Sequence, residues 1–480
     1  MAMSDRATVR VLPGQFEPET HFYPRVLNAH IHPLVRFFFG LGNHRIAARY
    51  CHLHPFVQVE SVDAALGHKT EHFRWGGADL FHGASARGGR RMYVIETNSC
   101  PSGQKSMPRL DEMQEQGGYR VLLERAFLPL LKRRGAPSGA LAVLWDKNHM
   151  EVSGYAAVLA DLTGEEVFLV PCFDEDPDPS MRINDKRSIE IRTPEGDWVE
   201  VRGAFRYVTQ RPWNRIPPVT RTVILNPVAV CLAGGRNKML AAKAYDLHNA
   251  KLADSRLRIE VPETIWDVSL REIPLWVERM GGFAVVKNPY SNAGQGVWTV
   301  TNKGELDDLM KREQRYDQFI VQQLIGNVGW SSRSRNGAIY HVGTVPNRRG
   351  KLHVADLRFM VGCGPEGFFP VAVYARRARE SLESEVPEDS WSVLGTNLSV
   401  RGPDGEWTTE SERLVLMDSR DFNRLGVGVD ELIDAYVQTV LAVTAIDEMA
   451  QRLVTTKGRF GRKLFQSLNP DASLVAEICP

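Results

Sequence analysis

A hairpin with a polar end, near the start of the chain, is the feature that most constrains the fold. The run Met92-Tyr93-Val94-Ile95 is apolar and partly β-branched, as a short buried strand should be, and it continues directly into Glu96-Thr97-Asn98. Because side chains alternate along a strand, Glu96 and Asn98 share one face. The turn Gly88-Gly89 would place the earlier segment GGADLF, which carries Asp79, alongside this strand. The pattern predicts an antiparallel hairpin with three oxygen-bearing side chains at one end.

These side chains suggest a site for a hard cation. Two carboxylates and one amide oxygen, from Asp79, Glu96 and Asn98, leave open positions for phosphate oxygens, which is how Mg²⁺ is usually held in nucleotide enzymes. The alternative is a surface strand with a polar end, and these residues alone do not exclude it. Cys100 follows closely, but no basic partner is evident, so we expect a bystander and not a catalytic thiol.

The composition is that of an ordinary globular protein. The chain has 480 residues, of which 43% are hydrophobic and 24% charged, and Lys and Arg total 59 against 58 Asp and Glu. This balance argues against a general nucleic-acid or membrane-surface binder. Six scattered cysteines without a CxxC pair indicate a reducing compartment, and the histidines between 30 and 54 match no zinc signature. Without an apolar leader or a run of roughly 18 apolar residues, we expect a cytoplasmic protein.

A βαβ pattern lies in the second quarter of the chain. It consists of the strand LAVLWD at 141–146, a helix at 153–164 and a strand at 165–172, and it implies a parallel sheet. A hairpin at 188–203 follows. The pattern predicts a small α/β domain.

We therefore divide the chain into three expected domains. Residues 1–135 hold helices and the polar-ended hairpin, residues 136–235 form the small α/β domain, and residues 236–480 hold antiparallel sheets. The last domain ends in a long amphipathic helix at 429–454 and a basic, polar tail.

Lys287 is a candidate phosphate ligand. It ends the apolar strand AVVK, where a lysine needs an anionic partner or water. The small residues that follow, including Ser291, Gly294 and Gly296, let backbone N–H groups approach phosphates closely, as a lid over a nucleotide would. The alternative is a plain hairpin whose lysine reaches out to solvent. Lys238, in the first turn of an expected helix, is a second candidate cation.

Two other strands carry candidate site residues. Asp356 and Arg358 share a face, so the arginine could clamp a phosphate or, alternatively, pair with an internal aspartate. The run Gln322-Gln323-Leu324-Ile325 ends a buried strand and could present backbone groups to an adenine edge, as a hinge between two lobes does. The alternative for this run is plain core or surface.

Taken together, these motifs resemble the ATP-grasp superfamily. Lys238 with VPETI, Lys287 with NPYSNAGQG, the hinge VQQLI, DLRFMVG and GTNLS occur in the order of the family's signature. The family's final Asp … Glu-x-Asn set is instead found near the N-terminus, as GGADLF and YVIETNSCPSG. That order looks like the circular permutation of glutathionylspermidine synthase and eukaryotic glutathione synthetase. The resemblance covers roughly residues 70–425 and implies a permuted α/β (α+β) ATP-grasp fold with an inserted small parallel α/β domain.

The resemblance also implies a role for each matching residue. Asp79, Glu96 and Asn98 would hold Mg²⁺, and Arg358 and Lys287 would be catalytic. One departure is the hinge, where a commonly acidic position is taken by glutamine. The residues implied to bind ATP are Lys238, Lys287, Ser291, Gly294, Gly296, Gln322, Gln323, Ile325 and Asn397.

The implied function is an ATP-dependent carboxylate–amine ligase that forms an amide bond through an acyl phosphate. Two alternatives keep the fold: a kinase that stops after phosphorylation, and a nucleotide-binding scaffold in a biosynthetic complex. We expect small-molecule substrates, such as an amino acid, a peptide or a polyamine, with neither nucleic acid nor membrane as a partner, and a homodimer as the common default. Candidates for clamping the carboxylate are Arg376, Arg377, Arg206 and Arg211.

Overall fold

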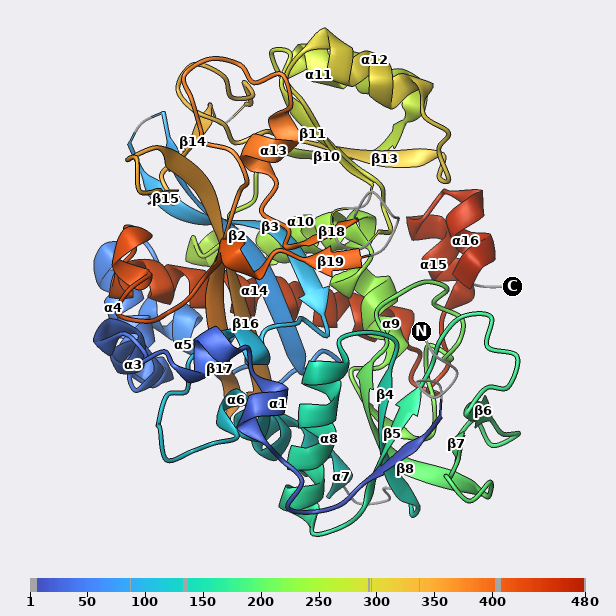
Figure 1. Ribbon diagram of the computed structural model, residues 1–480. Coiled ribbons are helices and arrows are strands. Elements are labelled where there is room, and N and C mark those ends of the chain that lie inside the picture. Colours follow the sequence, from blue (N-terminus) through green and yellow to red (C-terminus); the bar gives the residue numbers. More distant parts are fainter. Residues whose placement is uncertain are drawn as a thin grey trace.

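The described residues form three large sheets and a separate two-stranded one, shown in a computed structural model (Figure 1). The structure describes residues 7–86, 88–132, 137–291, 294, 296–335, 337–401 and 407–478. We refer to the layers as the upper, central and lower sheets, following their order in Figure 1. The central and lower sheets share one continuous apolar core, whereas the upper sheet has a separate core around Val286 and Phe319.

The central sheet joins strands from distant parts of the chain. It contains β2 (Trp75–Ser85) and β3 (Arg90–Ser99), which form the predicted hairpin, and β16 (Leu352–Gly364) and β17 (Gly367–Arg377). β2 pairs with β16, so Asp79 and Arg358, 279 positions apart, are direct neighbours. The shorter strands of this layer are β14 (Ile339–His341), β15 (Thr344–Pro346) and β20 (Leu414–Val415).

The predicted hairpin contains one irregularity. Asp79 lies opposite Glu96, but Leu80 lies opposite Val94, so Ile95 is an extra residue in β3. Because of this bulge, Ile95 and Glu96 both line the same cavity, which is described below.

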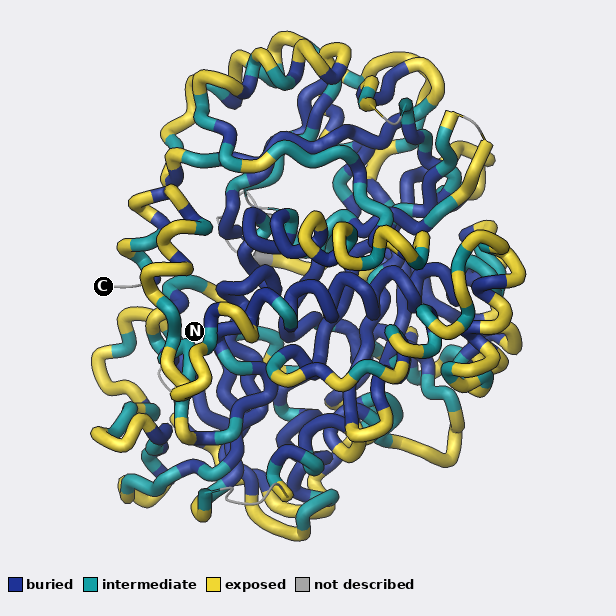
Figure 2. Tube along the Cα trace, turned by 180° about the vertical axis from the view of Figure 1, so that it is seen from behind, coloured by how far each residue is buried: buried dark blue, intermediate teal, exposed yellow. Residues whose placement is uncertain are grey.

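Helix α14 (Val429–Leu453) covers one face of the central sheet. It contacts β2, β3 and β16 on that side, and α3 (Pro33–Phe39), α4 (Asn43–Leu53), α5 (Val59–Gly67) and α10 (Lys238–Lys251) around the rest. The helix is therefore buried along most of its length instead of exposing a polar side, as the amphipathic pattern suggested (Figure 2). Its polar side chains serve the core: Asp447 accepts hydrogen bonds from the backbone N–H groups of residues 71, 72 and 73.

The upper sheet is antiparallel, in the order β10-β13-β11-β12. Its strands are β10 (Thr264–Ser269), β11 (Ala284–Lys287), β12 (Val297–Val300) and β13 (Gln318–Gln322). Helices α11 (Ile273–Arg279) and α12 (Lys303–Lys311) cover the side away from the central sheet (Figure 1). The predicted strand–turn–strand around Lys287 is confirmed, because β11 and β12 pair.

The lower sheet contains the predicted βαβ unit. β4 (Ala140–Trp145), β5 (Val167–Pro171), β8 (Trp198–Tyr207) and β9 (Val223–Leu225) are parallel, and α8 (His149–Thr163) connects the first two. The predicted hairpin is also present, with β7 (Ile189–Arg192) antiparallel to β8 and β6 (Met181–Ile183) beside it. β1 (Val9–Val11) pairs with β5, so the sheet takes a strand from outside residues 136–235. Residues 135 and 136, where we placed the domain boundary, lie outside the described residues.

The remaining elements are short. They are α1 (Pro18–His21), α2 (Pro24–Leu27), α6 (Gly117–Leu122), α7 (Leu128–Leu131), α9 (Val228–Val230), α13 (Ser390–Leu394), α15 (Arg462–Leu468), α16 (Ala472–Ile478), and the two-stranded sheet of β18 (Ser399–Arg401) and β19 (Trp407–Thr409). In the part of the chain that the structure describes, no helix combines the length and the apolarity needed to cross a lipid bilayer.

Candidate functional site

A cavity of about 250 Å³ lies where the three sheets meet. The upper sheet contributes Val285, Lys287 and the run that follows β13, and the central sheet contributes residues of β2, β3, β16 and β17. Loops at the edge of the lower sheet close the third side, with Lys147, Asn148 and Tyr207. The cavity therefore collects residues from the first, middle and last parts of the sequence.

The three predicted metal ligands all line this cavity. Asp79 faces Glu96 across the β2–β3 pair, and Asn98 lies opposite Gly77, one pleat further along. The described residues contain no group of three or more His, Cys, Asp or Glu that could hold a metal ion. The predicted set is different in kind, since it consists of two carboxylates and an amide oxygen.

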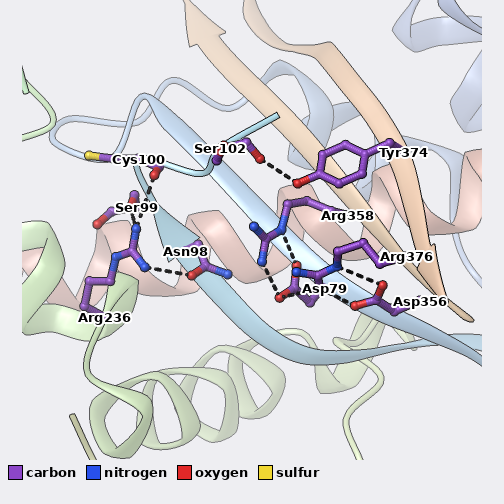
Figure 3. A network of polar contacts seen from close by, with 10 residues as sticks. All are labelled: Asp79, Asn98, Ser99, Cys100, Ser102, Arg236, Asp356, Arg358, Tyr374 and Arg376. Atoms are coloured by element: carbon purple, nitrogen blue, oxygen red, sulfur yellow. Dashed lines mark hydrogen bonds and ion pairs between the residues drawn. The ribbon is translucent and has the colours of Figure 1, made fainter. Parts of the chain in front are cut away.

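Asp79 is already paired with two arginines (Figure 3). The Arg358 Nε and NH2 groups donate to its two oxygens at 2.6 and 2.7 Å, and Arg376 NH2 lies 3.0 Å from Oδ2. Arg376 also donates to Asp356, at 3.0 Å from Nε to Oδ1. Burial opposes ionisation of Asp79, but the two guanidinium groups hold the pKa of that carboxyl well below its usual range. The internal Asp–Arg pair considered from the sequence thus exists, but Arg358 pairs with Asp79 and not with Asp356.

The two predicted lysines meet the hairpin from the other side. Lys287 Nζ donates to the Ile95 carbonyl at 3.1 Å and to Gln322 Oε1 at 2.7 Å, and burial lowers the pKa of Lys287 to about 8. Lys238 Nζ lies 3.2 Å from Glu96 Oε1 and donates to the carbonyl and hydroxyl of Ser291 at 2.9 and 3.1 Å. Both ammonium groups therefore lie beside the polar end of the hairpin.

Lys238 lines a second cavity, of about 420 Å³. The two cavities share Ile95, Glu96, Lys287 and Gln322. These four shared residues form the junction between the two cavities.

Five of the other predicted ATP-binding residues line the first cavity, and two do not. Gly294, Gln322, Gln323, Ile325 and Asn397 line the first cavity, whereas Ser291 and Gly296 do not. Asn292, Ala293 and Gln295, which belong to the predicted lid, lie outside the described residues.

The hinge glutamines are held by internal hydrogen bonds. Gln322 accepts from Lys287 and donates to Thr264 Oγ1 at 2.9 Å. The Gln323 amide bonds to the backbone of residues 263 and 337. Both side chains are thus engaged in hydrogen bonds within the protein.

Several cavity residues were missed by the sequence reasoning. Arg236 donates to Asn98 Oδ1 at 3.1 Å and to the carbonyls of Ser99 and Cys100 at 2.8 and 3.2 Å, which fixes the end of β3 (Figure 3). Lys147 lies two residues after the apolar strand LAVLW, much as Lys287 ends an apolar strand, and a similar argument would have singled it out. Lys105 and Tyr374 carry no comparable sequence signal.

The lining of the cavity carries a positive charge. It includes six cationic side chains and three carboxylates, the latter on Asp79, Glu96 and Asp356. The cations are Lys105, Lys147, Arg236, Lys287, Arg358 and Arg376. An excess of cations in a mostly buried space favours an anionic ligand.

Among the four arginines predicted as carboxylate clamps, Arg376 alone lines this cavity. Arg206 is the clearest error: its guanidinium is buried and donates to the carbonyls of Asn226 and Val208 inside the lower sheet. Cys100 behaves as expected, because burial raises the pKa of its thiol to about 11 and the thiol donates to the Arg206 carbonyl at 3.0 Å.

Comparisons with known proteins give structural similarities alone. No family model and no curated protein matches the sequence. A candidate γ-glutamylcysteine synthetase from Methylobacillus flagellatus KT matches over 88% of this chain and 99% of its own, at 13% identity and a TM-score of 0.44. A glutathione synthetase-like effector from Globodera pallida matches over 72% and 81%, at 10% identity and a TM-score of 0.39. A RimK domain protein ATP-grasp from Sphaerobacter thermophilus DSM 20745 matches over 52% and 92%, at 16% identity and a TM-score of 0.28.

All three similarities are weak. Their TM-scores are below 0.5, so they carry no argument about the chemistry of this chain. The protein has a mixed α/β fold with several sheets, and the case for its function rests on the cavity itself.

Proposed function

We propose that this protein is an ATP- and Mg²⁺-dependent carboxylate–amine ligase with a circularly permuted ATP-grasp arrangement. One observation carries the proposal: an early hairpin and lysines far downstream meet at a single cavity junction. Lys287 Nζ bonds to the carbonyl of Ile95, and Lys238 lies 3.2 Å from Glu96. That is the arrangement expected if acidic ligands written early in the chain serve a nucleotide held by later residues.

The nucleotide would lie between the upper and central sheets. Lys287 and Lys238 would neutralise its phosphates, while the run from Gln322 to Ile325 would border the base. Gly294 and Asn397 would complete the wall on the opposite side of the cavity. Because Lys287 is buried and lies at the junction of both cavities, it is the natural contact for the phosphate chain.

The residues fit Mg²⁺ by the chemistry of their donors. Glu96, Asp79 and Asn98 offer hard oxygen ligands at adjoining positions of one strand pair, although in this structure Asp79 pairs with Arg358 and Arg376 and Asn98 Oδ1 accepts from Arg236. The buried Nδ2 of Asn98 has no hydrogen-bond partner among the described residues, which leaves a donor for a phosphate oxygen. When bound, the ion would neutralise charge between the phosphate oxygens.

Catalysis would rest on positioning and charge. A carboxylate oxygen of the substrate attacks the γ-phosphorus, the bond to ADP breaks, and an acyl phosphate forms; the amine then attacks the carbonyl carbon, loses a proton and displaces phosphate. Arg358 and Arg376, held in place by Asp79 and Asp356, would stabilise the charge on the transferred group. No side-chain nucleophile is required, which agrees with a Cys100 thiol that stays protonated.

The test is ADP release with magnesium present, over a panel of amino acids, peptides and amines. ADP formation that requires both a carboxylate and an amine supports the ligase. If ADP forms equally well without amine and a stable phosphorylated product accumulates, the protein is a kinase and not a ligase. Glu96→Ala should abolish most of the ADP release, whereas the matched control Glu115→Ala, in an exposed loop, should not.

A further inference from the structure

Lys105 is a buried cation whose ammonium group has no polar partner in the part of the chain that the structure describes. It lies in the short turn Gln104–Ser106 that follows β3, and its side chain lines the cavity with 7% of the residue exposed. Its Nζ lies 5.3 Å from the centre of the Tyr23 ring. Among the described residues, no carboxylate or other acceptor forms an ion pair or hydrogen bond with it. A buried ammonium group of this kind requires an anion or water.

Lys147 approaches the same side of the cavity from the lower sheet. It is the second residue after β4, at the carboxyl edge of the parallel strands, which is where α/β sheets bind ligands. Burial, together with the charges of Arg236, Arg358 and Lys105, lowers the pKa of Lys147 to about 8, although the Asp146 carboxylate acts in the opposite direction. Lys147 therefore lies close enough to these three cations to feel their charge.

Asp79 pairs with Arg358, but among the described residues Asp146 and Glu151 form no ion pair with Lys105 or Lys147. Asp146 accepts hydrogen bonds from the backbone of Thr209 and Gln210 and pairs with Arg215 at 3.1 Å. Glu151 accepts from Ser102 Oγ at 2.6 Å and from the N–H groups of residues 103 and 104 at 2.8 and 2.9 Å. Neither carboxylate lines the cavity. The positive charge on this side is therefore left for a ligand.

Lys105 and Lys147 are contributed by other parts of the fold than the lysine expected to bind the phosphates. They come from the turn after β3 and from the lower sheet, whereas Lys287 comes from the upper sheet. The same cavity is also lined by the hydrogen-bonding side chains of Tyr23, Ser102, Ser106, Asn148 and Tyr207. A charged wall with hydroxyl and amide groups is suited to a carboxylate.

We propose that Lys105 and Lys147 form a second anion subsite, which selects a substrate with two carboxylates. One carboxylate would be activated beside Arg358, and the other would be held by the two lysines. This inference rests on the proposed ligase function and deepens it, since it names small dicarboxylates as the class of acyl substrate.

The test is calorimetric binding to the full chain in the presence of MgADP. The probes are succinate and glutarate, each against its monocarboxylate analogue, butyrate and valerate. We expect each dicarboxylate to bind at least about tenfold more tightly than its analogue, and Lys105→Met or Lys147→Met to remove about tenfold of that preference. Binding of the monocarboxylates and of MgADP should not change, which also shows that the variants are folded.

The controls keep the outcomes separate. Lys132→Met, an exposed lysine after α7, should leave all affinities unchanged, and Lys105→Arg should restore much of the preference. Equal affinity for dicarboxylates and monocarboxylates, or an equal loss for both in the lysine variants, would overturn the subsite. Lysine-dependent binding of succinate without ADP release for any amine would keep the subsite and reject the ligase. If monocarboxylates support ADP release from ATP and neither lysine variant changes it, the ligase is kept and the subsite is rejected.

Discussion

The two faces of the central sheet divide the work of the molecule. On β16, Phe359 packs against Tyr436 of α14, with ring centres 5.8 Å apart, and against Phe38 at 5.7 Å. The preceding residue, Arg358, points the other way and pairs with Asp79 in the cavity. Neighbours in sequence thus belong to an apolar core on one face and a charged site on the other, as strand alternation dictates.

The two faces also differ in what they contribute to stability. Burial of aromatic and aliphatic side chains under α14 is strongly favourable. Buried ion pairs such as Asp79 with Arg358 and Arg376 gain little net stability, because desolvation offsets their attraction. We therefore expect changes on the helix face to lower stability and changes on the cavity face to lower activity.

The largest effect should follow from Phe359→Ala. Its side chain is fully buried, and losing the ring should lower the free energy of unfolding by about 3–5 kcal/mol. Turnover per folded molecule should stay near that of the parent. Denaturant unfolding and ADP-release assays below the unfolding transition measure the two quantities. Phe56→Ala, at a side chain that is 74% exposed, is the control and should change stability by less than about 0.5 kcal/mol. A comparable loss of turnover in Phe359→Ala would contradict the prediction that the helix face affects stability alone.

Glu96→Gln should lower turnover and leave stability nearly unchanged. Losing one carboxylate from the cavity should raise the activation free energy of turnover by about 2–4 kcal/mol. The free energy of unfolding should change by less than about 1 kcal/mol. Its sequence neighbour Thr97 accepts a hydrogen bond from Tyr245 OH at 2.7 Å on the other face, so Thr97→Val should affect stability alone, by about 1 kcal/mol. Normal turnover in Glu96→Gln would remove this residue from the site.

Lys287→Met should mainly weaken nucleotide binding. The lost charge should cost about 1.5–3 kcal/mol, or roughly 10- to 100-fold in the KM for ATP, with a smaller change in kcat. Steady-state kinetics at saturating carboxylate and amine measure both constants. Arg335→Met, at the mostly exposed rim of the second cavity, is the comparison variant and should change the KM far less. Equal effects of the two changes would mean that Lys287 does not contact the phosphates.

The smallest effect should be a dependence on pH. Burial lowers the pKa of Lys287 to about 8, so the lysine is charged below this pH and loses its proton as pH rises through it. The affinity for MgADP should therefore fall by up to about tenfold per pH unit above pH 8. Calorimetry between pH 7 and pH 9.5 measures this decline, and Lys287→Arg should show a flat profile. If the affinity of the parent protein for MgADP does not change between pH 7 and pH 9.5, the protonation of Lys287 plays no part in binding.

Local patterns predicted individual strands and the pairing of strands close in sequence, because alternation and apolar runs span only a few residues. The hairpin at Glu96, the strand of Lys287 and the βαβ unit all follow this rule. The pairing of Asp79 with Arg358 was beyond such reasoning, because it joins residues 279 positions apart. Lys105 was missed for the same reason, since only the assembled layers bring its turn to the cavity.

The bulge at Ile95 has a consequence for how a ligand would be seated. A regular strand sends consecutive side chains to opposite sides, but the extra residue lets an apolar and an acidic side chain, Ile95 and Glu96, reach the same space. The apolar surface of Ile95 and the charged surface of Glu96 are thereby placed side by side in the cavity. In an ATP ligase, that juxtaposition would let one strand end support the flat base and the charged phosphate tail of the same molecule.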